Sequence, residues 1–439
     1  MPKSSQSIIT LPAAISIGVG GMIGAGIFSI LGLVAEASGA AMWISFLIGG
    51  IIALFSTYSY AKLGAKFPSA GGAVEFLVRG FGLGPISSSI NLFMWLAYII
   101  SIALYAQGFA AYFMTFFTTT PAPLLEKGVA CGIVILFTAL NCLGASTVGK
   151  AEIVIVLIKV SILILFALIG LFFIHPEQLS PRYYSTIEHI LFGTGVLFIG
   201  YEGFGLITNA AANMVNPEKN LPRALYISVL LVIGIYLAIS ITLVGNLSLQ
   251  EINAASDYAL AQAAKPFLGL FGFQLIAIAA LFSTASAINA TLFGAANVSY
   301  LIARDGELPA TFYRREWKNA TGGLLITTAI TVIFILFFDL AGIAMMGSSA
   351  FLLIYAAVNA GHLRILKKTQ AKKSIVLLSL FLCLALFLTL EIYTYQQQPH
   401  AVYTMFGLLL ACFIIEQLYR NEKKPLAILP GKRRLRKNH

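Results

Sequence analysis

The stretch GVGGMIGAGIF at residues 18–28 carries five glycines in its first nine positions, although it lies inside a long apolar segment. A second glycine-rich stretch, FIGYEGFGLIT, follows at residues 198–208. Glycines of this kind allow close packing between helices, as the spacing Gly20-x-x-x-Gly24 would. Because the cluster occurs twice, we expect instead that two helices are interrupted at the middle of a membrane. The two expected interruptions are Gly24-Ala25-Gly26 and Gly203-Phe204-Gly205.

The rest of the chain is too apolar for a soluble protein. Of its 439 residues, 59% are hydrophobic and 10% are charged, whereas soluble domains have about 25% charged residues. The apolar runs are roughly twenty residues long, which suits spanning helices and excludes the alternating ten-residue strands of a membrane barrel. We therefore predict an all-α integral membrane protein with twelve transmembrane helices, at 11–35, 40–61, 86–117, 128–144, 152–174, 187–212, 222–245, 270–302, 321–338, 341–361, 374–391 and 401–419.

The two glycine-rich stretches divide this chain into repeats. Five helices per repeat give a first repeat at 11–174 and a second at 187–361, and an odd number of helices makes the second repeat inverted relative to the first. Two further helices occupy 374–419. The short tails are 1–10 and 420–439.

Positive charge is distributed unevenly between the two sides of the membrane. Of 28 Lys and Arg residues, only Lys127, Arg182 and Lys265 fall on the side opposite to the termini, and Lys159 falls inside a predicted helix. The positive-inside rule then predicts that both termini lie in the cytoplasm, with the protein in the cytoplasmic (inner) membrane. The basic run KRRLRK at 432–437 is expected to contact anionic lipid and not nucleic acid.

Several function classes are not supported by the residues present. The four cysteines lie in apolar runs without metal-ligand spacing, the five histidines are scattered, and no phosphate-loop or nucleophile motif occurs. We expect no enzyme activity, no metal, no cofactor and no obligate protein partner. A channel would need a continuous polar pore or a carbonyl filter, and the sequence offers neither.

The expected interruptions favour one kind of ligand. Free N–H groups at the start of a half-helix attract a carboxylate, and free carbonyls at the end of one attract a cation or an ammonium group. Two interrupted helices that cross at mid-membrane would therefore suit a zwitterion, and an α-amino acid is the obvious candidate.

Motifs along residues 10–310 resemble one transporter family. They are GGMIGAGIFSILG (20–32), SYAKLGAKFPSAGG (59–72), AEIVIVLIKVSILILFALIG (151–170), GYEGFGLITNA (200–210), NPEKNLPRAL (216–225), ALFSTASAINAT (280–291) and ARDGELP (303–309). With these motifs the sequence resembles the amino acid–polyamine–organocation (APC) transporters. The resemblance implies a LeuT-like five-plus-five inverted repeat with helices one and six broken, and secondary active transport of amino acids. Proton-coupled symport with broad or neutral specificity is expected, and exchange of amino acids, cationic amino acids or polyamines is the alternative.

Lys159 is the most informative single residue. A charged lysine at mid-membrane costs about 2.5 kcal/mol or more, so an ionisable group there indicates function. Desolvation disfavours the charged form of an amine, which would allow the group to cycle between two states. A snorkelling or structurally paired lysine is the alternative. The resemblance implies that this lysine replaces a sodium ion between helices one, five and eight, near the carbonyl of Gly20 and the hydroxyl of Ser283 or Ser286.

Glu202 lies inside the second glycine-rich stretch, where three roles are open. It would pair with a cationic substrate, carry a coupling proton, or face the extracellular vestibule. Tyr98 and Tyr105 are weaker pocket candidates. By resemblance, Phe198 and Phe204 line the pocket or its lid. The substrate-binding set predicted from the sequence is Ile23, Gly24, Ala25, Gly26, Phe198, Tyr201, Glu202, Gly203, Phe204 and Gly205.

Overall fold

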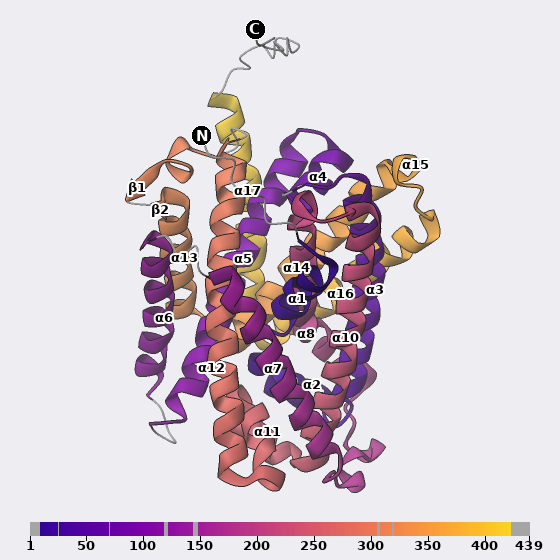
Figure 1. Cartoon of the computed structure of the whole chain (residues 1–439), viewed down its shortest axis with the longest axis vertical. Helices are drawn as coiled ribbons and strands as arrows, with labels where there is room; N and C mark the ends of the chain where they lie inside the picture. Colours follow the sequence, from indigo (N-terminus) through magenta and orange to yellow (C-terminus); the bar gives the residue numbers. More distant parts are fainter. Residues whose placement is uncertain are drawn as a thin grey trace.

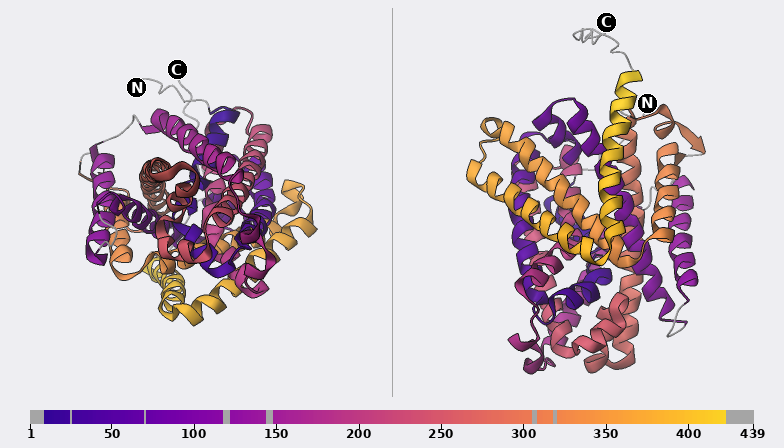
Figure 2. Two further views of the ribbon diagram at one scale, coloured as in Figure 1. Left: turned by 90° about the horizontal axis from the view of Figure 1, so that it is seen from below. Right: turned by 180° about the vertical axis from the view of Figure 1, so that it is seen from behind.

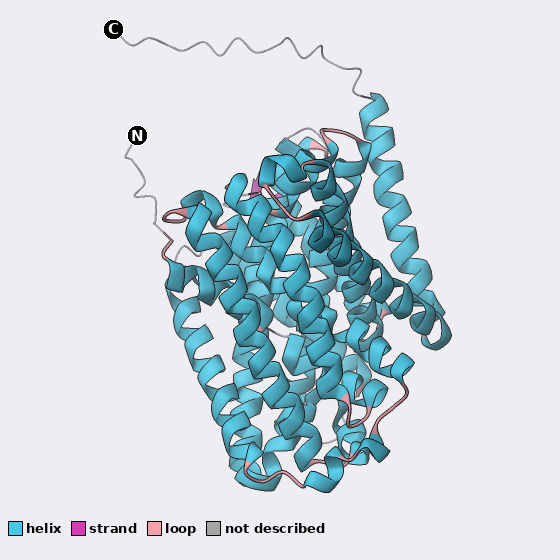
Figure 3. Cartoon of the chain, turned by 90° about the vertical axis from the view of Figure 1, so that its right-hand side faces the viewer, coloured by secondary structure: helices cyan, strands magenta, loops and turns pink. Residues whose placement is uncertain are grey.

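The computed structural model describes residues 9–24, 26–69, 71–117, 122–143, 148–304, 308–317 and 320–422. These residues form a bundle of long helices, several of which run along the length of the molecule (Figure 1). Almost all of the described chain is helical, with only a few short connecting loops (Figure 3).

The first glycine-rich stretch interrupts a helix, as predicted. Helix α1 (Leu11–Met22) ends just before Ile23, and α2 (Gly26–Ser38) starts in a direction that differs by 43°. The predicted site residue Ala25 lies between the two helices, outside the described residues.

The second glycine-rich stretch does not open in the expected way. Helix α8 (Ile187–Leu197) tightens into the 3₁₀ helix η3 (Phe198–Gly205), and α9 (Leu206–Asn209) follows directly. The N–H of Leu206 donates to the carbonyls of Gly203 and Phe204, so this backbone keeps local hydrogen bonds. The predicted unwinding at Gly203 and Gly205 is therefore wrong, because hydrogen bonds from residue i to i+3 replace the α-helical ones.

The other long helices lie close to their predicted positions, except that α12 begins well before the predicted residue 270 and is kinked at Gly269, where φ is 61°. Their bounds are α3 Met42–Lys66, α5 Pro85–Met114, α6 Pro123–Leu143, α7 Val148–Leu171, α10 Pro217–Asn246, α12 Ala259–Arg304, α13 Gly322–Phe337, α14 Leu340–Arg364, α16 Lys373–Gln397 and α17 Pro399–Glu422. Within the described residues, ten helices are long and apolar enough to span a membrane, or eleven if the bent pair counts as one. The predicted number of twelve is not reached, because α13 has only 16 residues.

Short elements connect the spans at both ends of the bundle. Helix α4 (Ala73–Phe81), helix α15 (Leu366–Thr369) and the antiparallel strands β1 (Arg315–Trp317) and β2 (Ala320–Thr321) lie at one end, and α11 (Leu249–Ala255) lies at the other (Figure 1). The remaining elements are η1 Pro176–Leu179, η2 Pro181–Tyr183, η4 Ala211–Asn213, η5 Ser256–Tyr258 and η6 Ala310–Phe312.

The centre of the bundle is built around α5. In the apolar part of α5, 89% of the residues are buried, against 17% in α6. Helices α16 and α17 run along the outside of the bundle (Figure 2). The interrupted helix and η3 lie in the interior, where α3, α10 and α14 pack against η3 and α5 packs against α2.

Candidate functional site

The interrupted helix crosses η3 with almost no space between the two backbones. A Cβ atom built on Gly203 would lie 2.3 Å from the carbonyl carbon of Gly21 and from the amide nitrogen of Met22. A Cβ built on Gly26 would lie 2.9 Å from the Cα of Gly200. Glycine is required at this crossing because any larger residue would push the two segments apart.

Side chains from three other helices satisfy the carbonyls that the interruption exposes. The ammonium of Lys159 on α7 donates to Gly20 O at 3.0 Å. The hydroxyl of Ser283 on α12 donates to the carbonyls of Ile23 and Gly24, at 3.1 and 2.9 Å. The hydroxyl of Tyr236 on α10 lies 2.6 Å from Met22 O. Polar groups without helical partners are thus held inside the protein, as the membrane interior requires.

Lys159 is buried, with 2% of its surface exposed, and its contact with Gly20 is the one that the resemblance implied. Ser283 lies at the same interruption, but its hydroxyl donates to the carbonyls of Ile23 and Gly24. Ser286 is half-buried three residues further along α12, and it has no hydrogen bond to another described residue. Helices α1, α7 and α12 therefore meet at the interruption, and Ser283 is the serine that binds a carbonyl there.

The start of η3 is fixed in a similar way. Ser348 accepts a hydrogen bond from the N–H of Ile199 at 3.0 Å and donates to Val196 O at 2.7 Å. The hydroxyl of Tyr236 also lies 3.0 Å from Gly200 O, so one side chain connects both crossing segments.

The three aromatic residues predicted to bind substrate are all fully buried, and none of them lines the central cavity. Phe198 and Phe204 pack against the ring of Tyr355, with ring centroids 5.8 and 5.0 Å apart. The hydroxyl of Tyr201 donates to Phe46 O on α3 at 2.9 Å, and this places the residue in the packing between α3 and η3. Substrate contact by Tyr201 stays a prediction.

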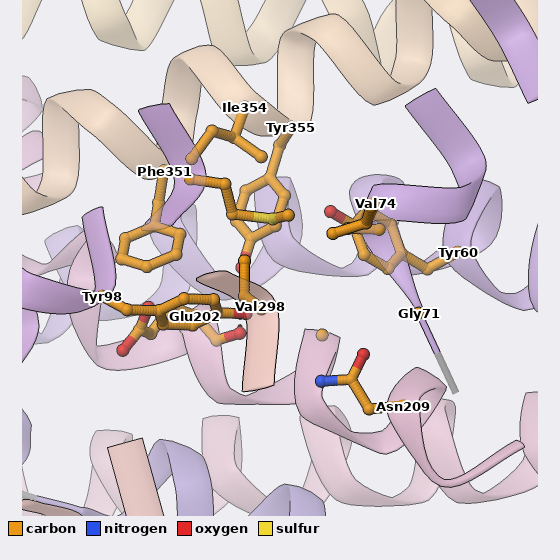
Figure 4. A pocket seen from close by; sticks show the side chains of 13 residues that line it. Tyr60, Gly71, Val74, Tyr98, Glu202, Asn209, Val298, Phe351, Ile354 and Tyr355 are labelled. Atoms are coloured by element: carbon orange, nitrogen blue, oxygen red, sulfur yellow. Dashed lines mark hydrogen bonds between the residues drawn. The ribbon is translucent and has the colours of Figure 1, made fainter. Parts of the chain in front are cut away.

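A small cavity of about 20 Å³ lies next to η3 (Figure 4). A volume of this size holds about one water molecule. The cavity is lined by Tyr60, Gly71, Ala73, Val74, Met94, Tyr98, Glu202, Gly205, Asn209, Val298, Phe351, Ile354 and Tyr355. Only Glu202, Gly205 and the weaker candidate Tyr98 were singled out from the sequence.

Glu202 is buried at this cavity, with 8% of its surface exposed. Its Oε1 accepts a hydrogen bond from the hydroxyl of Tyr105 at 2.7 Å, and its backbone carbonyl accepts one from Tyr355 at 2.9 Å. The structure therefore argues against the suggestion that this carboxyl group faces a polar vestibule.

Metal-binding geometry is not found in the described part of the chain. No group of three or more His, Cys, Asp or Glu side chains there could hold an ion.

An interrupted helix that crosses a second polar segment at the centre of a membrane bundle is typical of transporters. Comparison with known proteins agrees with this class, because residues 9–415 match the family described as amino acid permease. The chain belongs to this family. It is a multi-pass membrane protein of a transporter family, and it is not an enzyme.

Relatives extend over nearly the whole chain. Uncharacterized protein MJ0609 of Methanocaldococcus jannaschii is 42% identical over 420 residues, which cover 95% of this chain and 96% of that protein. Inner membrane transport protein YbaT of Escherichia coli is 32% identical over 410 residues, covering 93% and 95% of the two chains. Cationic amino acid transporter 3, mitochondrial, of Arabidopsis thaliana is 28% identical over 372 residues, which cover 80% of this chain and 61% of that protein.

Proposed function

We propose that the protein is a proton-coupled symporter that carries amino acids of broad or neutral specificity across the cytoplasmic membrane by alternating access. The observation that supports this most directly is the hydrogen bond from the buried Lys159 to Gly20 O. Here a side-chain ammonium donates to a carbonyl in the last turn of α1, just before the interruption. A covalently attached cation that gains and loses a proton would replace an exchangeable metal ion at this place.

The coupling step follows from the geometry of this contact. Protonated Lys159 donates to Gly20 O and so ties α7 to the end of α1. A deprotonated amine is a much weaker donor, and the tie between the two helices would loosen. The bound proton acts as a ligand that stabilises the arrangement in which α7 is tied to α1. Proton loss would then favour the other arrangement, which opens toward the cytoplasm.

The amino acid itself would bind at the interruption. The first N–H groups of α2, which begins at Gly26, suit an α-carboxylate. The carbonyls of Met22, Ile23 and Gly24 suit an α-ammonium, since each carbonyl has a second lone pair beside the one that a side chain already uses.

The architecture we propose has twelve spans, with α13 as the shortest, in two inverted repeats at 11–174 and 187–361 and an appended pair at 374–419. The distribution of Lys and Arg supports termini in the cytoplasm and a C-terminal tail on anionic lipid. Within the family we propose the closest functional likeness to ApcT, the proton-coupled transporter of broad specificity.

The decisive experiment is uptake of a panel of labelled amino acids into proteoliposomes that contain the purified protein. We expect accumulation when the outside is acidified, with no dependence on sodium. The alternative is an exchanger of amino acids, cationic amino acids or polyamines, and the Arabidopsis relative is named as a cationic amino acid transporter. Uptake that depends on amino acid inside the liposomes, whether or not a pH gradient is present, would favour exchange.

A further inference from the structure

The carboxyl group of Glu202 is only half satisfied. Tyr105 donates to Oε1, and Ser101 lies near the carboxyl group from the same face of α5. The second oxygen, Oε2, is buried and has no hydrogen-bond partner among the described residues. Burial of an acidic oxygen without a partner is costly, so this oxygen beside a cavity is available to a ligand that can donate to it.

Within the described part of the protein, no Lys, Arg or His side chain forms a salt bridge with Glu202. The nearest groups in the cavity are aromatic, because Tyr98, Phe351 and Tyr355 line it beside the carboxyl group (Figure 4). Their ring centroids form a chain, 5.9 Å from Tyr98 to Phe351 and 6.2 Å from Phe351 to Tyr355. Aromatic faces attract cations, and their attraction increases when water is excluded.

Glu202 is also close to the interrupted helix. Its neighbour Gly203 contacts Gly21, and Gly200, two residues before it, contacts Gly26. The interruption and the cavity therefore lie against the same short helix, η3.

We propose that the cavity receives the side-chain ammonium of a basic amino acid, with Glu202 as the counter-ion and the three rings as the wall. This inference rests on the proposed amino-acid transport and narrows the substrate class. An ammonium is a compact charge about as large as the one water molecule that the cavity holds, whereas a guanidinium is a larger planar group. Lysine and ornithine are therefore expected to bind better than arginine.

The test is competition against uptake of labelled alanine by the reconstituted full-length protein. Norleucine is the matched ligand, because it has the chain of lysine without the charge. We expect lysine and ornithine to inhibit at concentrations about tenfold lower than norleucine, as a charge-assisted hydrogen bond allows. Glu202→Gln keeps the size of the side chain and the acceptor for Tyr105, and it should abolish this tenfold preference.

Glu391→Gln is the matched control variant. Glu391 on α16 has the same exposed fraction of 8% and also has a buried Oε2 without a partner, but it does not line this cavity. Its replacement should leave the preference of lysine over norleucine unchanged. Thermal stabilisation of the purified variants by each ligand gives the same ratio without any need for transport.

Two results would overturn the proposal. The first is that lysine competes no better than norleucine in the wild type. The second is that Glu202→Gln retains the wild-type preference for lysine over norleucine. If that variant at the same time loses acceleration by a pH gradient, Glu202 carries a coupling proton and does not bind the substrate side chain. A wild-type protein that transports no amino acid at all would instead refute the proposed function.

Discussion

Gly21 and Gly203 contact each other through their backbones at the centre of the molecule. A Cβ on Gly21 would lie 3.2 Å from the Cα and 3.3 Å from the carbonyl oxygen of Gly203. The contact joins the segment next to Lys159 with the segment that carries Glu202. Any displacement of one ionisable side chain relative to the other therefore involves this pair of glycines.

The first prediction concerns the crossing itself. Gly203→Ala should destabilise the protein by about 1–3 kcal/mol, because the added methyl group would meet backbone atoms of Gly21 and Met22. Gly205→Ala is the control, since its methyl group would meet only Tyr60 at 3.7 Å. Thermal unfolding of the purified proteins measures both effects. Equal melting temperatures for the two variants would contradict this account of the crossing.

The second prediction concerns the start of α2. Gly26→Val should abolish substrate binding, because its side chain would displace Gly200 from the interruption. Gly234→Val on α10 has open space around its Cβ and serves as the control. Calorimetric titration of folded protein with amino acid checks the result. Wild-type affinity for amino acid in a well-folded Gly26→Val protein would show that the substrate does not bind at the interruption.

The third prediction concerns Lys159. Lys159→Ala should lose accumulation driven by a pH gradient, although amino acid still binds at the interruption. Lys159→Arg should fail as well, because a guanidinium stays protonated. The control is Lys127→Ala, since Lys127 also donates to a backbone carbonyl, Leu336 O, but is exposed. Gradient-driven uptake by Lys159→Ala would show that the coupling proton binds at another residue.

The fourth prediction concerns Tyr236. Tyr236→Phe removes the hydroxyl that contacts Met22 O and Gly200 O, so two buried carbonyls each lose a hydrogen-bond donor. We expect a loss of stability of about 1–3 kcal/mol and a raised KM for uptake, because both crossing segments lose their common partner. Tyr201→Phe removes a bond to Phe46 O instead, and it should change stability without changing KM. A raised KM in Tyr201→Phe would restore this residue to the binding site.

The sequence predicted the long elements well because membrane thickness constrains them. The predicted helices at 86–117 and 187–212 differ by only a few residues from α5 and from the span Ile187–Asn213. The first interruption was also predicted, because glycine has a low helix propensity and this stretch has five glycines in nine positions. The second was misjudged, because glycine content alone does not distinguish an open break from a 3₁₀ helix that side chains such as Ser348 stabilise.

The cavity was predicted less completely than the interruption. Tyr60, Phe351 and Tyr355 are isolated aromatic residues in long apolar helices, and nothing in their spacing separates them from ordinary core residues. Tyr201 was grouped with Phe198 and Phe204 because all three lie at the second glycine-rich stretch, whereas its hydroxyl binds Phe46 O on α3. Successive residues of a 3₁₀ helix point in directions about 120° apart, so neighbours in the sequence face different partners.

The bond between Lys159 and Gly20 also has a consequence for how transport depends on the medium. A dissolved cation fills its site according to its concentration, whereas a cation tethered to α7 has an effective concentration that the fold fixes. The fraction of protein with a cation beside Gly20 O therefore does not depend on the concentration of any salt in the medium. Under the proposed coupling, the acidity of the medium controls whether the tethered group carries charge. The rate of transport is then expected to saturate with hydrogen ions and with substrate, and not to depend on which alkali metal is present.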